Sequence, residues 1–216
     1  MSIPDQTEEF GRGVHDRFGH RLHFNVPGRG TNAVLARVIE RVNADDELYA
    51  LWVAANVNAV ERLGMTDHGP VHVKIVMNIA DKLFRTLTDQ GVPTGVATNY
   101  EMGLDEAEVV VVMAALLHDI GMSIHRSDHE SYSLFLAQQK VRELLDGLYD
   151  LPTATILRSE ILHAIIAHRS GGKPLTLEAG IVRVADALDM AKGRSRISVA
   201  GGSMSIHSLS LSLIHI

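Results

Sequence analysis

The middle of the chain reads Val109-Val110-Val111-Val112-Met113-Ala114-Ala115-Leu116-Leu117, an unbroken apolar run, and continues as His118-Asp119-Ile120-Gly121. A helix that is apolar on every side is buried, and this one is too short to span a bilayer. We therefore expect a core helix that Gly121 ends, with His118 and Asp119 in its last turn. The sequence thus predicts two polar side chains at the end of a central helix.

The flanking sequence has helical periodicity and cap residues rather than alternating strands. Capping and apolar spacing predict helices over about 31–42, 45–63, 71–88, 105–120, 128–148, 153–167 and 177–191. The stretch 91–103 contains Pro93 and Gly95 and is expected to be a loop beside the site. Because no long alternating strand precedes Arg196, we expect an all-α fold.

Three regions are expected along the chain. Residues 1–30 are polar and rich in Gly and Arg, which predicts a loose arm with solvated histidines. Residues 31–195 are long enough for one domain with a substantial core. Residues 196–216 are expected to be the remnant of a β-containing C-terminal region. The last of them, about 211–216, resemble translated adapter sequence from library preparation; a genuine final β-strand is the alternative.

Composition favours a folded enzyme that uses nitrogen and oxygen ligands. The chain has no Cys, so a metal site must be built from His and carboxylate, and twelve His are many for 216 residues. A net charge of -6 argues against broad nucleic-acid binding and against anionic membranes. No signal peptide or membrane span is visible, which makes the cytoplasm the default location.

Four potential metal ligands occur in the order His, His-Asp, Asp, namely His72, His118, Asp119 and Asp186. Imidazole nitrogen and carboxylate oxygen together suit Mn²⁺, Fe²⁺, Ni²⁺ or Zn²⁺. Taken alone, the central pair is equally a helix-terminal histidine beside a solvated carboxylate. His72 shares an inward stripe with Val76, which indicates that its side chain is buried.

The segments around these residues give the pattern its context. Asp67-His68-Gly69-Pro70-Val71-His72 and His118-Asp119-Ile120-Gly121 resemble the ligand motifs of the HD superfamily of metal-dependent phosphohydrolases. The segments 167–175 and 184–189 are similar to the end of its HD-GYP group. The resemblance covers about residues 56–190 and implies an all-α HD-domain bundle. Met122 replaces a Lys of the HD-GYP pattern and the Gly-Tyr-Pro signature is absent, so the cyclic dinucleotide specificity is not transferred.

The resemblance also implies a ligand set for one or two divalent ions, among which Mg²⁺ is a further candidate. His72, His118, Asp119 and Asp186 would hold the first ion. His129 and His168 fit the added ligands of members with two ions, and Asp119 would bridge them. Helical phase prefers His168 to His163, which is roughly 140° around the same helix and is left near the ligands. A core histidine bonded to backbone is the alternative for each imidazole.

Other polar residues are candidates for contacts around the ions or with substrate. The N-cap signal at Ser127-Asp128 leaves His125 and Arg126 in a loop. Asp189 is either a hydrogen-bond acceptor for a ligating histidine or a surface carboxylate. Guanidinium groups bind phosphate in a bidentate manner, and the arginines near the ligand segments are Arg169, Arg194 and Arg196. The alternative for each of them is a solvated side chain at a helix end.

The sequence hypothesis is a phosphomonoesterase or phosphodiesterase that attacks a nucleotide-like phosphoester with metal-bound hydroxide, using His118 and Asp119 as catalytic residues. The nucleotide-like substrate rests on family analogy alone. Two other classes stay open. One is a sensor that binds metal and nucleotide with little turnover, and the other is a helical interaction domain. A homo-oligomer is compatible with the sequence.

Overall fold

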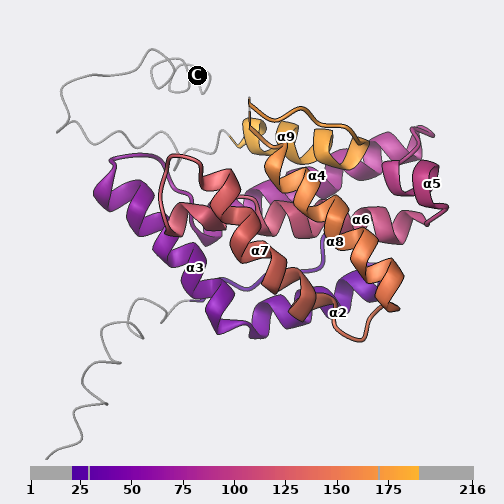
Figure 1. Ribbon diagram of the computed structural model, residues 1–216, viewed down its shortest axis with the longest axis horizontal. Coiled ribbons are helices and arrows are strands. Elements are labelled where there is room, and N and C mark those ends of the chain that lie inside the picture. The colour runs from indigo at the N-terminus through magenta and orange to yellow at the C-terminus, as the bar shows by residue number, and fades with distance from the viewer. Residues whose placement is uncertain (1–20, 29, 170, 190–216) are drawn as a thin grey trace, which may run out of the picture.

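The computed structural model describes residues 21–28, 30–169 and 171–189. Within these ranges the chain is helical without a strand, which confirms the predicted all-α fold (Figure 1). The elements are α2 (Ala33–Ala44), α3 (Asp46–Asn56), a π-helical segment η1 (Val57–Arg62), α4 (Pro70–Asp89), α5 (Gly95–Tyr100), α6 (Leu104–Leu117), a 3₁₀ segment η2 (Ile120–Ser123), α7 (His129–Leu145), α8 (Leu151–Ile166) and α9 (Leu177–Leu188). Arg194, Arg196 and the expected extension 196–216 lie outside these residues.

Helix α6 is the centre of the bundle, as its apolar sequence predicts. Every residue from Val109 to Leu117 is fully buried. Helices α4, α8 and α9 pack around α6, and in Figure 1 α7 and α8 pass in front of it while α2 lies at the base. No helix in the described part of the chain is both long and apolar enough to traverse a bilayer.

Gly121 acts through close packing and does not end α6. The helix ends earlier, at Leu117, and Gly121 lies within η2. A Cβ atom on Gly121 would lie 2.1 Å from the carbonyl oxygen of His129 and 2.3 Å from the amide nitrogen of Ser133. The Gly121 amide donates to Ser133 Oγ at 2.9 Å. Glycine is therefore needed where η2 touches the first turn of α7.

Residues 21–28 are packed, where we expected part of a loose arm, and residues 1–20 of that expected arm lie outside the described residues. Residues 21–28 run along α2 and α3, and Phe24 is 1% exposed. Its ring lies 4.9 Å from the Trp52 ring, and its amide donates to Asn43 Oδ1 at 2.8 Å. His23 is exposed, as expected. The polar composition of this segment gave no indication that Phe24 is buried. Burying such a ring stabilises a fold by about 1.5–3 kcal/mol.

The expected loop 91–103 contains a short helix, α5, and is remote from the ligand candidates. Thr94 caps α5 at the amide of Ala97, and the buried Glu178 carboxylate accepts from the amides of Gly95 and Val96. Satisfied first-turn amides stabilise a helix start, and half of this cap comes from α9. The segment joins the C-terminal end of α4 to the N-terminal end of α6, opposite His72.

Other predicted boundaries agree with the structure to within a few residues. The helix expected over 45–63 begins as α3 and continues as η1, and Gly64 follows it at φ +62°. Helix α7 begins after Asp128, although that side chain makes no cap hydrogen bond. These differences reflect local packing rather than a different fold.

A buried carboxylate, Glu108, sits in a polar cluster between α2, α4 and α6. It is 4% exposed, accepts from Asn32 Nδ2 at 2.9 Å and pairs with Arg85. Burial raises the pKa of Glu108 to about 7, a shift that Asn32 and Arg85 oppose and Asp81 reinforces. Its ionised form is therefore disfavoured in the folded state.

We expect Glu108→Gln to remove part of the pH dependence of stability. The folded pKa lies above the ordinary carboxyl value, so the folded state binds the proton more tightly and loses stability as pH rises through about 4.5 to 7. The loss should be on the order of 2 kcal/mol. Urea unfolding at pH 5 and pH 8 measures it, and superimposable profiles for wild type and variant would contradict the assignment.

Candidate metal centre

The ligand candidates meet because five helix ends come together at one end of the bundle. His72 lies in the first turn of α4, and His129 is the first residue of α7. His118 and His168 directly follow the last turns of α6 and α8, and Asp186 lies in the last turn of α9. Residues 114 positions apart in sequence are thereby brought into one cluster.

The first group consists of His72, His118 and Asp186, whose ligand atoms lie within 4.8 Å of one another. The two Nε2 atoms of the histidines are 3.2 Å apart. Asp186 Oδ1 is 3.6 Å from His72 Nε2 and 3.8 Å from His118 Nε2. Both histidines are buried, with 1% and 0% exposure.

The second group consists of Asp119, His129 and His168, all of them buried. Asp119 Oδ1 lies 3.1 Å from His129 Nε2 and 3.5 Å from His168 Nε2. The other oxygen, Oδ2, lies 3.4 Å from Nε2 of both His72 and His118. Asp119 therefore faces one group with each of its carboxylate oxygens.

Hydrogen bonds at Nδ1 fix which nitrogen of each imidazole is available. His118 and His168 donate from Nδ1 to the carbonyl oxygens of Ala115 and Ile165, at 2.8 and 2.6 Å. His129 Nδ1 lies 3.0 Å from the Arg126 carbonyl oxygen. The carbonyl partners of His118 and His168 select the neutral tautomer whose Nε2 carries a lone pair, and Nε2 is the atom that each of the three rings presents to the cluster.

The carboxylates make the cluster attractive to cations. Burial opposes the charge of Asp119, but the charge of His118 and the close imidazoles of His118, His129 and His168 hold its pKa well below the ordinary value. The pKa of Asp186 is likewise lowered by His118 despite burial. Burial disfavours protonated His118, yet the two carboxylates raise its pKa to about 10. Without a metal ion, the negative charge of Asp119 and Asp186 holds a proton on His118.

The donor set fits divalent metal ions. Two atoms bound to one ion at about 2.0–2.2 Å lie within about 4.4 Å of each other. The three distances between ligand atoms of the first group, and both distances from Asp119 Oδ1 in the second, meet this limit. Buried imidazole and carboxylate ligands suit Mn²⁺, Fe²⁺, Ni²⁺ or Zn²⁺, and the described residues could hold two such ions.

A cleft of about 400 Å³ opens onto both groups. Arg126 and Arg169 line it beside the ligand candidates, and Arg169 Nε pairs with Glu130 at 3.2 Å. The two guanidinium groups both approach His129 Nδ1, at 3.2 Å from Arg126 and 3.4 Å from Arg169, and partial burial and the charge of Arg169 lower the pKa of Arg126. The cleft therefore combines a buried cation site with positive charge at its mouth.

Two further candidates do not line this cleft. His125 is exposed in the loop, as expected, and its Nδ1 accepts from the amide of Ser127 at 3.0 Å. His163 Nε2 accepts from the amide of Leu175 at 3.0 Å. Met122, in the position of the HD-GYP lysine, is buried against Ala55 and Ala59. The side chain at position 122 therefore packs into the fold.

Asp189 and His68 surround His72. Asp189 is buried and accepts from His72 Nδ1 at 2.7 Å. It is therefore a hydrogen-bond acceptor that orients the His72 ring and not a surface carboxylate. Sequence reasoning missed His68, which lines the cleft, is 7% exposed and lies 4.0 Å from Asp119 Oδ2 through Nε2. The four-residue spacing between His68 and His72 could have indicated a second ring near the ligands. Gly69 and Pro70 instead indicated that the helix begins after His68.

Comparison with known proteins agrees with this geometry. The HD domain family model matches residues 71–191. The chain is 40% identical over 160 residues to the uncharacterized protein MJ1020 of Methanocaldococcus jannaschii, covering 74% of this chain and 62% of that protein. It is 28% identical over 176 residues to Ribonuclease Y of Thermoanaerobacter pseudethanolicus, covering 74% of this chain and 30% of the relative.

A second Ribonuclease Y, from Geotalea uraniireducens, is 29% identical over 189 residues, covering 82% of this chain and 30% of that protein. No solved structure matches the chain significantly. The chain spans less than two thirds of the length of these relatives. Since the matched region contains His72, His118, Asp119 and Asp186 and makes up more than half of the sequence, the chain belongs to the HD domain family.

Proposed function

We propose that this protein is a metal-dependent phosphohydrolase with two divalent ions bridged by Asp119. The observation that carries the proposal is the 3.2 Å approach of the Nε2 atoms of His72 and His118. Both rings use Nδ1 in other hydrogen bonds, so their Nε2 atoms face each other. Two Nε2 lone pairs repel at this distance unless a cation lies between them, either a proton on His118 or a divalent ion that replaces it, and nearby Asp119 and Asp186 supply the compensating charge.

The arrangement supports in-line attack on a phosphoester. When bound, divalent ions activate water as a nucleophile at neutral pH and neutralise the phosphoryl oxygens. Asp119 would orient the attacking water, because its two oxygens face both groups. Asp189 would keep the His72 ring in position. Arg126 and Arg169 would bind the remaining phosphate oxygens, since guanidinium groups recognise phosphate in a bidentate manner.

We infer that the substrate is a nucleotide-like phosphoester, either a monoester or a diester. A cleft of about 400 Å³ suits a small molecule or one segment of a chain. Two relatives are named Ribonuclease Y, which supports a phosphodiester of the RNA type as one member of this class. The net charge of -6 disfavours broad binding of long nucleic acids.

Metal analysis followed by a substrate screen tests the proposal. The purified protein should contain two divalent ions per chain and should hydrolyse at least one member of a panel of generic phosphoesters, nucleotides and short RNA. Tight nucleotide binding with metal but without turnover would favour the sensor alternative. Absence of bound metal after reconstitution with Mn²⁺, Fe²⁺, Ni²⁺ or Zn²⁺ would refute the metal centre.

His163 in α8 and His168 just after it provide a matched pair of variants. His168→Ala removes an imidazole that faces Asp119 Oδ1 at 3.5 Å, so we expect the metal content to fall from two ions to one. His163→Ala removes the acceptor for the Leu175 amide and should leave the metal content unchanged. Elemental analysis of both purified variants measures the difference. Equal metal content would show that His168 is not a ligand.

A further inference from the structure

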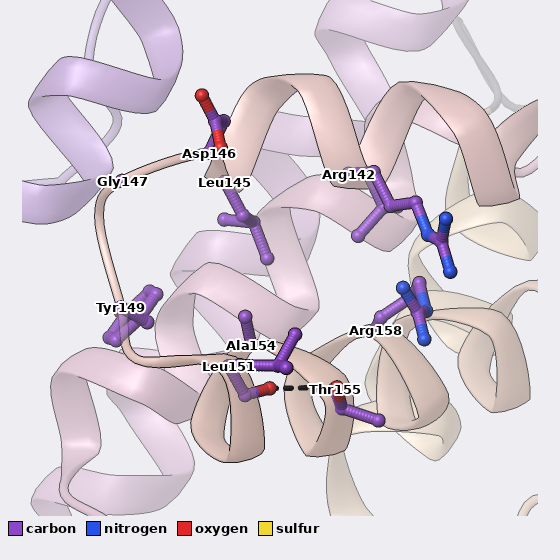
Figure 2. Close-up of a pocket in the computed structure, with 10 residues that line it drawn as sticks. Arg142, Leu145, Asp146, Gly147, Tyr149, Leu151, Ala154, Thr155 and Arg158 are labelled. Carbon is purple, nitrogen blue, oxygen red and sulfur yellow. Dashed lines mark hydrogen bonds between the residues drawn. The ribbon is translucent and has the colours of Figure 1, made fainter.

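A second cleft lies between α7 and α8, outside the metal centre. Its volume is about 510 Å³, within the range of small-molecule sites. Figure 2 shows Arg142 from α7 and Arg158 from α8 extending toward each other at one end of it. Arg142 is thirteen positions from His129 along α7, which corresponds to about 20 Å of helix. The cleft is therefore separate from the proposed active site.

Nearby acidic groups do not balance the two arginines. Among the residues that the structure describes, no hydrogen bond or ion pair involves the guanidinium group of Arg142 or Arg158. The Glu143 carboxylate is engaged by Lys140 and Gln139, and Asp150 caps α8 at the amide of Thr153. Two like charges thus face each other at the cleft, an arrangement that an oxyanion stabilises.

The remainder of the cleft is largely apolar. Leu145, Leu151 and Ala154 lie beside the arginines, and Leu151 is 79% exposed at the rim (Figure 2). Asp146 lies at the end away from the guanidinium groups, and its carboxylate points outward (Figure 2). The surface therefore offers positive charge at one end and apolar contact area next to it.

We propose that this cleft binds a soluble organic phosphate. The guanidinium groups of Arg142 and Arg158 hold the phosphate between α7 and α8, and the organic part covers Leu145, Leu151 and Ala154. Guanidinium groups bind phosphate through paired hydrogen bonds, and a small cleft with an apolar floor suits a compact ligand such as a nucleoside monophosphate. The site does not depend on the metal centre.

Thermal unfolding of the full chain with inorganic phosphate or AMP tests this site. Measurements use a chelator and sodium chloride at equal ionic strength, so that binding at the metal centre is suppressed. A ligand that binds only the folded state stabilises it by RT ln(1 + [L]/Kd), so the midpoint rises with ligand concentration. We expect both probes to raise the midpoint of wild type, with AMP effective at lower concentration because it also covers the apolar floor.

The double variant Arg142→Gln/Arg158→Gln should weaken binding at least about ten-fold, since hydrogen bonds to charged groups are the stronger class. Lys82→Gln, which removes one exposed charge from α4, is the control and should respond like wild type. A full response in the double variant would overturn the site. So would a response that requires metal, or binding to phosphatidic acid vesicles without binding to the soluble probes.

Discussion

Asp119→Ala is expected to reduce metal-dependent phosphoester hydrolysis by at least about 1,000-fold. Asp119 is the residue that faces both ligand groups, through Oδ2 toward His72 and His118 and through Oδ1 toward His129 and His168. Its loss would remove the proposed bridge and leave four imidazoles without that anion. Each 1.36 kcal/mol of lost transition-state stabilisation costs a factor of ten, and metal activation contributes several kcal/mol.

Steady-state rates on the substrate found in the phosphoester screen, measured with metal contents, check this prediction. Asp119→Asn keeps the size of the side chain and removes its charge, so it separates the electrostatic role from packing. Both variants should lose activity and bind less metal while retaining the helical circular dichroism spectrum. Near wild-type turnover by either variant would disprove the bridging role of Asp119.

Gly121→Ala is expected to destabilise the fold by about 3 kcal/mol or more, because the clash involves backbone atoms that cannot rotate away. The new Cβ would lie 2.1 Å from the His129 carbonyl oxygen. For a chain of this size, such a loss lowers the unfolding midpoint by about 6–12 °C. The first turn of α7 must shift to relieve the clash, so His129 should also lose its alignment with Asp119.

Gly180→Ala is the matched control, since a Cβ on Gly180 in α9 would meet no atom within 4 Å. Alanine is favoured over glycine inside a helix by about 0.5–1 kcal/mol, so this variant should be slightly more stable than wild type. Calorimetric midpoints of the two variants should move in opposite directions. Equal stability of wild type and Gly121→Ala would mean that η2 and α7 are not in close contact.

Local sequence signals were sufficient for the helices that bury a continuous apolar face. The apolar run from Val109 to Leu117, ended by Gly121, indicated a core helix, and Asn32 and Asp45 mark helix starts as the structure has them. Local sequence signals were insufficient where the stabilising partner of a segment is distant in sequence. Helix α5 is capped in part by Glu178, and Phe24 is held by Trp52 and Asn43. Neither contact has a local signature.

The sequence by itself determined which side chains are available for chemistry: buried histidines and aspartates on helices, and no cysteine. The tertiary structure decided how those side chains are directed. It placed Asp189 behind His72, brought His68 to the cleft and moved His163 to the Leu175 amide. Periodicity specifies the face of a helix that is buried, whereas the direction of an imidazole depends on partners that only the folded chain brings within hydrogen-bond distance.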